Sequence, residues 1–243
     1  MAAPYGLNVI DSCISCKVRE ERLFCNLHGA SLHELDRIKF AVSYPGGSTL
    51  YAEGQPSRGV MILCQGRVKL TMSSAEGKTL IIKIADPGEV LGLSATLSGR
   101  PHDTTAESIG PAQVSLIKRD DFNHFVERYP EVTLHAAKEL CAMHNTAWNE
   151  IRMLGLSQSI PERLARLVLD WDSKQTTPKR GSLKVFLTHE EIAQFLGTSR
   201  ETVTRALLAW KKRKIVDVKG STLSILDRRQ LEQIADGSSH NQR

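Results

Sequence analysis

The chain has 243 residues, of which 41% are hydrophobic, and its formal net charge is +5 at pH 7. This length suits two domains, and the apolar content is sufficient for packed cores, which excludes extensive disorder. No stretch approaches the roughly 18 uninterrupted apolar residues of a membrane span. The start, MAAPYGLNVIDSC, lacks the basic residues and the apolar run of a secretion signal. We therefore expect a cytoplasmic protein without a membrane partner.

Residues 1–30 form a segment rich in cysteine. Three of the chain's five cysteines lie there in the pattern C-x2-C-x8-C, at Cys13, Cys16 and Cys25. Because disulfides are rare in the cytoplasm, such a group more often binds metal or senses redox state. The spacing alone leaves three interpretations open: metal ligands, redox-active thiols and ordinary small hydrophobic residues.

Residues 31–129 have the pattern of an antiparallel sheet protein. From about Ser43 to Ile117, glycines interrupt short runs rich in β-branched residues, as in GVMILCQGRVKLTMS and GKTLIIKIADPGEVLGLS. Short strands separated by glycine turns pair antiparallel. This predicts a sandwich or roll rather than β-α-β units, followed by a short helix over residues 119–128.

Residues 130–156 predict one long helix that begins at Pro130, since proline is favoured in a first helical turn. An apolar stripe with a/d-type spacing runs along it for more than three heptads. A helix of about 25 residues is ~37 Å long, more than a roll of this size needs. We therefore expect a dimer interface, although packing on the chain's own sheet would give the same pattern. The stripe consists of Val132, Ala136, Leu140, Met143, Ala147, Ile151 and Leu154.

Residues 157–243 differ from the rest of the chain in charge. They contain 16 Lys and Arg against 10 Asp and Glu, whereas residues 1–156 contain 16 against 17. A basic C-terminal part behind a nearly neutral N-terminal part indicates a polyanionic partner for one end of the chain. We expect an amphipathic helix from Pro161, two short helices, a hairpin around Lys219-Gly220 and a closing helix.

The most informative segment is LTHEEIAQFLGTSRETVTRALLAWKKRKIV. Thr188 and Glu191 form a capping box that starts one helix, and Gly197 ends it in the left-handed conformation that glycine tolerates. Thr198 and Glu201 predict a second capping box and a second helix. Two helices joined by a tight glycine turn indicate a helix-turn-helix.

The second of these helices has two chemically distinct faces. At 100° per residue, an apolar side with Val203, Leu207 and Trp210 lies opposite a side with Arg, Glu and Thr. In a major groove, arginine grips guanine O6 and N7 and glutamate accepts from cytosine N4, while lysines that follow meet phosphates. The candidate residues for binding double-stranded DNA are Thr188, Ser199, Arg200, Glu201, Thr204, Arg205, Lys211 and Lys219.

Enzymatic motifs are missing from the sequence. It contains no G-x-S-x-G, no H-E-x-x-H and no P-loop, and thus no convincing pairing of nucleophile and base. We expect a binding protein and not an enzyme.

The run S-R-E-T-V-T-R resembles the recognition-helix motif of the Crp/Fnr transcription regulators. The resemblance covers nearly the whole chain and implies an α+β fold: a cyclic-nucleotide-binding-like jelly roll, a dimerisation helix and a winged helix-turn-helix. Arg200, Glu201 and Arg205 match the three base-reading positions of the Crp-type branch. The implied function is transcription regulation by a homodimer that binds a palindrome of TGTGA-like half-sites, with RNA polymerase as a further partner.

The same resemblance bears on what the roll senses. Crp-type members bind cyclic AMP through a glutamate after a glycine and an Arg-Ser pair about ten residues later. In PGEVLGLSATLSGRPHDTTAE, Leu93 stands at the glutamate position and His102-Asp103 at the Arg-Ser position. A cyclic phosphate needs a cation and hydrogen-bond donors, and Asp103 would repel it. We therefore do not expect cyclic AMP as the effector.

Fnr-type members hold an oxygen-labile [4Fe–4S] cluster with N-terminal cysteines and one cysteine of the roll. The resemblance implies such a cluster here, sensing redox state, oxygen or nitric oxide, and four thiolates are normally required. The family's fourth position aligns near Ser115, so Cys64 is expected to substitute, ahead of Cys141. A zinc site that adds His28, or a thiol switch, with a small-molecule effector in the roll, is the alternative. The expected cluster ligands are Cys13, Cys16, Cys25 and Cys64.

Overall fold

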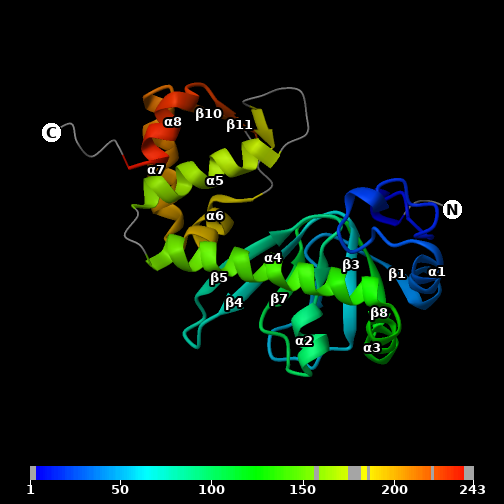
Figure 1. Cartoon of the computed structure of the whole chain (residues 1–243). Coiled ribbons are helices and arrows are strands. Elements are labelled where there is room, and N and C mark those ends of the chain that lie inside the picture. The colour runs from blue at the N-terminus through cyan, green and yellow to red at the C-terminus, as the bar shows by residue number, and fades with distance from the viewer. Residues whose placement is uncertain (1–3, 156–158, 175–181, 185–186, 220–221, 238–243) are drawn as a thin grey trace. The chain divides into compact units, whose positions relative to one another are not determined.

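The computed structural model (Figure 1) describes residues 4–155, 159–174, 182–184, 187–219 and 222–237. The chain divides into two compact units, Met1–Trp148 and Asn149–Arg243. Each unit is described by itself. Among the described residues, no helix is both long and apolar enough to cross a membrane.

The first unit is a roll made of two four-stranded sheets, and every strand pair in them is antiparallel. The strand orders are β1-β8-β3-β6 and β2-β7-β4-β5. The strands are β1 (Lys39–Tyr44), β2 (Thr49–Tyr51), β3 (Gly59–Gln65), β4 (Val68–Ser73), β5 (Thr79–Ala85), β6 (Val90–Leu91), β7 (Thr105–Ser108) and β8 (Ala112–Lys118). This confirms the antiparallel roll that the glycine-punctuated runs predicted.

Gly66 shows why the turns need glycine. It joins β3 to β4 with φ of +83°, and a Cβ placed there would lie 2.4 Å from the carbonyl oxygen of Pro111. An L side chain would therefore both strain the backbone and collide with the chain leading into β8.

Both faces of the first sheet are buried at its strands β3 and β8. Leu63 of β3 and Val114 of β8 point into a cluster shared with the second sheet, whereas Ile62 and Ile117 point into a cluster shared with helices. A strand covered on both faces reads as a continuous hydrophobic run, which is why GVMILC shows little alternation. The helices of this unit are α1 (Gly29–Ile38), α2 (Leu93–Ser98), α3 (Arg119–Arg128) and most of α4 (Pro130–Gly155).

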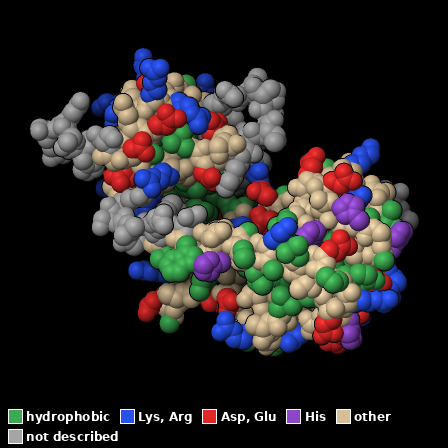
Figure 2. Space-filling model, in the orientation of Figure 1, with side chains coloured by type: hydrophobic (Ala, Val, Ile, Leu, Met, Phe, Trp, Pro, Cys, Tyr) green, Lys and Arg blue, Asp and Glu red, His purple; other side chains and the backbone are tan. Residues whose placement is uncertain are grey.

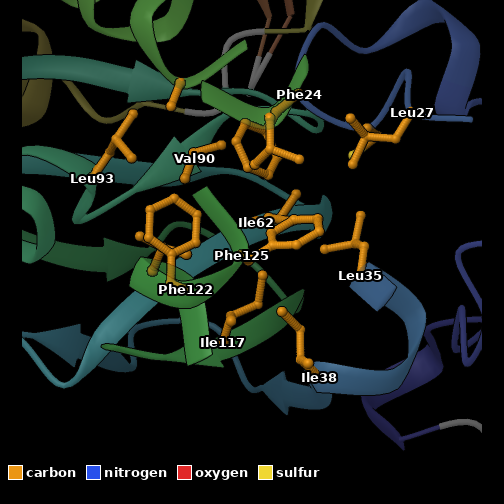
Figure 3. Close-up of a cluster of buried hydrophobic side chains, with 14 of the residues drawn as sticks. Phe24, Leu27, Leu35, Ile38, Ile62, Val90, Leu93, Ile117, Phe122 and Phe125 are labelled. Carbon is orange, nitrogen blue, oxygen red and sulfur yellow. The ribbon is translucent and has the colours of Figure 1, made fainter. Parts of the chain in front are cut away.

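The helix-side cluster, shown in Figure 3, also takes up the cysteine-rich segment. Phe24 and Leu27 of that segment are fully buried there, beside Phe122 of α3 and beside Val132 and Ala136 of α4. The ring centroids of Phe24 and Phe122 are 6.1 Å apart. The N-terminal segment is therefore part of the roll's core and packs with the first turns of α4.

The second unit is a small helical domain with a three-stranded sheet in the order β10-β11-β9. Its core contains Leu164, Ile192, Val203, Trp210 and Leu231, all fully or nearly fully buried. Its elements are α5 (Ile160–Lys174), β9 (Ser182–Lys184), α6 (His189–Leu196), α7 (Arg200–Lys212), β10 (Val216–Lys219), β11 (Thr222–Ile225) and α8 (Arg228–Ala235). The helix-turn-helix and the hairpin beside it have the predicted order, so the expected α+β fold is confirmed.

Burial of Phe24 gives a direct test of the N-terminal packing. Replacing Phe24 by Ala should lower the free energy of unfolding of the first unit by about 3–5 kcal/mol, because the ring leaves a cavity. The neighbouring Leu23, 39% exposed, is a matched control whose replacement by Ala should cost about 0.5 kcal/mol or less. Native-state hydrogen exchange of the β3 amides measures both; equal effects would contradict this packing.

Candidate nucleic-acid interface and cysteine site

The first helix of the helix-turn-helix, α6, begins at the predicted capping box. The Glu191 backbone N–H donates to Thr188 Oγ1 at 3.2 Å, and the Thr188 N–H donates to Glu191 Oε2 at 2.9 Å. Gly197 ends the helix in the left-handed conformation, with φ of +61°. Both local predictions are confirmed. Thr188 is exposed, but its hydroxyl also donates to Glu191 at 3.0 Å.

The second helix, α7, begins one residue away from the predicted box. Its N-cap is Ser199, whose hydroxyl accepts from the Thr202 N–H at 3.3 Å, so the box of Thr198 and Glu201 is wrong. The Thr198 N–H instead donates to the Ala193 carbonyl at 2.9 Å within the turn. The pattern S/T-x-x-E favoured Thr198 because Glu201 follows it by three residues, but Ser is the better N-cap by type.

The two faces of α7 are as predicted. Val203, Leu207 and Trp210 are buried in the second unit, while Arg200, Glu201 and Arg205 are exposed in its first two turns. The pKa of Glu201 is lowered by its own backbone N–H, then by the Ser199 hydroxyl and the nearby arginines. The carboxylate therefore stays ionised at neutral pH, ready to accept hydrogen bonds.

Thr204 has a partner that the sequence did not reveal. Its Oγ1 lies 2.9 Å from Nδ1 of His189, the first residue of α6, and the two atoms are hydrogen-bonded. This bond ties the exposed side of α7 to the preceding helix. No periodicity marks the pair, because the two residues lie on different helices.

The predicted phosphate-contacting lysines lie around one carboxylate. Asp217 of β10 is 3.0 Å from the Lys211 ammonium and 3.6 Å from that of Lys219. The pKa of Asp217 is lowered, chiefly by the hydrogen bond from Lys211. Lys219 keeps 84% of its side chain exposed, so it is free to contact a polyanion, while Lys211 joins the end of α7 to β10.

The stripe predicted as a dimer interface lies partly in the core of the same chain. Val132 and Ala136 are buried in the roll, Leu140 packs partly against it and Met143 is half-buried. These positions therefore cannot all face a second copy, and the prediction is wrong for Val132 and Ala136. Ala147 and Ile151 are exposed, whereas the Leu154 side chain lies outside the described residues. The alternative of packing on the chain's own sheet is correct for the first turns.

A second stripe on α4 is exposed instead. Its positions are spaced 3, 4, 3, 4 and 3 residues apart, a heptad pattern, and it lies roughly 100° around the helix from the predicted one. In Figure 2, hydrophobic side chains with histidine among them follow the course that α4 takes in Figure 1. The exposed stripe consists of Leu134, Ala137, Cys141, His144, Trp148 and Ile151.

The fold brings the cysteine-rich segment to β3. Cys25 is buried in one cluster with Ile62 of β3, and Cys13 packs against that cluster. Cys64 raises the pKa of Cys13 and of Cys25, and Cys16 raises the pKa of all three. Cys64 Sγ lies 3.3 Å from the Ser115 hydroxyl on β8. Cys64 thus occupies the position next to Ser115 on the adjoining strand.

Burial dominates the chemistry of these thiols. It raises the pKa of Cys13 and of Cys25 to about 12, and it also raises the pKa of Cys64. Lys39 opposes the shift at Cys13, and Arg22 opposes it at Cys25 and Cys64. The protonated thiols are therefore poor nucleophiles at neutral pH. No three His, Cys, Asp or Glu side chains within the described ranges are arranged to hold a metal ion.

Hydrogen bonds tether the cysteine-rich segment to the first unit at its first cysteine and just before it. Asp36 of α1 accepts from the Cys13 backbone N–H at 2.6 Å and from the Ser12 hydroxyl at 3.1 Å. The buried Gln113 side chain accepts from the Ile10 N–H at 2.9 Å and donates to its carbonyl at 2.8 Å. These hydrogen bonds within the protein therefore fix the position of the segment on the first unit.

The positions expected to bind a cyclic phosphate carry other contacts. Leu93 is fully buried in the core. His102 is buried and stacks on Tyr51, with ring centroids 3.9 Å apart. Burial lowers the pKa of His102, so the ring is not the cation that a phosphate would need.

Comparison with known proteins connects these features. A family model of the Crp-like helix-turn-helix domain matches residues 162–234, and one of the cyclic nucleotide-binding domain matches residues 41–129. The chain is 26% identical over 211 residues to a CRP-like cAMP-activated global transcriptional regulator of Mycobacterium tuberculosis, covering 86% of this chain and 94% of that protein.

Two further relatives carry the name FixK. The chain is 26% identical over 225 residues to the nitrogen fixation regulation protein FixK of Bradyrhizobium diazoefficiens, covering 92% of this chain and 93% of that one. The solved structure of FixK2 from Bradyrhizobium japonicum superimposes with a TM-score of 0.72 at 24% identity, covering 81% and 97%. Together with the roll, the long helix and the helix-turn-helix, these matches show that the chain is a DNA-binding transcription regulator of the Crp/Fnr family.

Proposed function

We propose that this regulator binds, as a homodimer, a palindrome of TGTGA-like half-sites. The observation that supports this best is the exposed start of α7, where Arg200, Glu201 and Arg205 extend from a helix whose other side is buried. The arginines match guanine O6 and N7, and the ionised Glu201 matches cytosine N4. Lys219 lies in the hairpin beside α7, where it would contact phosphates.

The proposed dimer uses the exposed stripe of α4 from Leu134 to Ile151. A heptad-spaced stripe suits parallel pairing of two identical helices, because equivalent positions then meet in the same layer. Burying it would also remove Leu134, Trp148 and Ile151 from water, each of which is more than half exposed in the single chain. Two copies related by a two-fold axis present two α7 helices to the two half-sites. RNA polymerase is a further partner that we propose from the family resemblance.

Binding to DNA is the first test. The full chain should bind a TGTGA palindrome in fluorescence anisotropy, with an affinity that falls steeply as salt rises. Replacing Arg200 by Ala should weaken binding by about 1–3 kcal/mol and relax selectivity at one base pair. Arg229, exposed on α8, is the control, since its replacement by Ala should leave base selectivity unchanged. Equal affinity of the wild type for palindromic and scrambled duplexes would refute the proposal.

The dimer face gives a second test. A glutamate at Leu134 or Ile151 would place like charges opposite each other in the seam, so the dimer dissociation constant should rise at least ~100-fold. Analytical ultracentrifugation measures it. The control is Met72→Glu, on an exposed position of β4, which should leave the dimer intact. A dimer insensitive to both stripe variants would show that another surface pairs.

For the sensor, we propose an iron–sulfur cluster, a [4Fe–4S] centre, held by Cys13, Cys16, Cys25 and Cys64. Thiolates are the usual ligands of such a cluster, and the cysteine-rich segment packs in one core with β3, the strand that carries Cys64. Arg22 and Lys39 offset part of the charge that the thiolates would carry. Such a centre would supply iron that reacts with oxygen or nitric oxide. The chain's own part would be to give up four thiol protons and to bring the cysteines of the N-terminal segment within bonding distance of one centre.

Zinc or a thiol switch, with a small-molecule effector in the roll, is the alternative function. Burial of Cys25 and Cys64 disfavours a switch by direct oxidation, because their raised pKa keeps the reactive thiolate scarce. A zinc site that includes His28 would have to bring an exposed ring to buried sulfur. A ligand set of four sulfur atoms therefore favours the iron–sulfur cluster over the zinc site.

Anaerobic purification tests the sensor. We expect a broad absorption band near ~400 nm that bleaches in air, with about four iron and four sulfide per chain. Replacing Cys64 by Ser should remove most of the iron, whereas the exposed Cys141, replaced by Ser, should keep it. A colourless protein that contains zinc would instead support the alternative.

A further inference from the structure

Leu208 of α7 is an apolar side chain in an unexpected place. At 60%, it is the most exposed of the large hydrophobic side chains that the structure describes. Its neighbour Leu207 is 5% exposed and Trp210 is 3% exposed, and these two form the buried side of the helix. Leu208 therefore lies outside the core of the domain and has no packing role there.

The helical position of Leu208 places it in the middle of the base-reading face. Taking Arg200 as zero and 100° per residue, Leu208 lies at about 80°, with Thr204 near 40°, Glu201 near 100° and Arg205 near 140°. It is about 12 Å along the axis from Arg200, a little over two turns. A helix that reads DNA with its first turns thus carries Leu208 on the same side, farther along the groove.

Chemistry limits what a leucine can recognise there. It has no donor or acceptor for a base edge or a phosphate, unlike the Arg, Glu and Thr residues around it. The one apolar group that B-DNA offers in its major groove is the C5-methyl of thymine. Contact with that methyl would remove apolar surface of both partners from water.

We propose that Leu208 is a specificity-determining residue that contacts a thymine methyl group in each half-site, beyond the bases read by Arg200, Glu201 and Arg205. This inference rests on the proposed DNA-binding function. It adds a thymine to the recognised sequence through shape and apolar contact, with no hydrogen bond.

The test removes the methyl group alone. The full chain, purified anaerobically, selects its preferred duplex from a random library, and each thymine of that duplex is then replaced by uracil. Fluorescence anisotropy compares the wild type, Leu208→Ala and Leu226→Ala. Leu226, 58% exposed and just after β11, is the matched control, because it is a leucine of the same domain outside α7.

One thymine in each half-site should respond. Its replacement by uracil should weaken wild-type binding about fourfold per half-site. This factor corresponds to the free energy of burying one methyl group. Leu208→Ala should bind the thymine-containing and the uracil-containing duplex with the same affinity, and Leu226→Ala should behave as the wild type. The inference is overturned if Leu208→Ala keeps the full methyl effect, or if no thymine methyl matters to the wild type. Failure of the wild type to select any duplex would instead overturn the DNA-binding proposal itself.

Discussion

One hydrophobic core, shared by three segments that are far apart in sequence, governs the first unit. Phe24 comes from the cysteine-rich segment, Ile62 and Ile117 from the roll, and Val132 and Ala136 from α4. Because protein interiors are close-packed, a shift of one member must be taken up by the others. The cysteine-rich segment therefore cannot be rearranged without affecting the first turns of the long helix, although no cysteine lies on the buried face of that helix.

The long helix shows where reasoning from sequence stops. The stripe from Val132 to Leu154 and the exposed one from Leu134 to Ile151 both repeat every three or four residues and share Ile151, and the first contains more aliphatic residues. The hydropathy pattern therefore favours the first stripe as the dimer interface, but its first two turns pack on the roll of the same chain. A helix that packs on its own domain and on a second copy needs two apolar faces. Only the position of the sheet tells which face remains available, and Ala137, Cys141 and His144 are too weakly apolar to be noticed without it.

Local chemistry, in contrast, was predictable. The capping box of Thr188 with Glu191, the left-handed Gly197 and the two faces of α7 depend on residues within a turn or two of one another. The predicted cap of α7 was wrong by one residue, because the capping-box pattern of Thr198 and Glu201 outweighed the better N-cap residue Ser199. Contacts that span the fold were not predictable: the Thr204–His189 bond joins two helices, and the position of Cys64 beside Ser115 depends on strand pairing. The gathering of the four cysteines was expected only through the family resemblance.

The proposed cluster would act as a switch only if its binding changed the packing of the chain. A site already formed in the unloaded chain would bind its ligand without altering anything else, since a ligand shifts an equilibrium only by its differential affinity for two states. Burial raises the pKa of Cys13, Cys25 and Cys64, so these thiols are protonated at neutral pH. Loading would have to remove protons and draw Cys13, Cys16 and Cys25 together toward β3. Because Phe24 immediately precedes Cys25, that movement would act on the core beneath α4, and the helix that carries the proposed dimer face would receive the signal through packing alone.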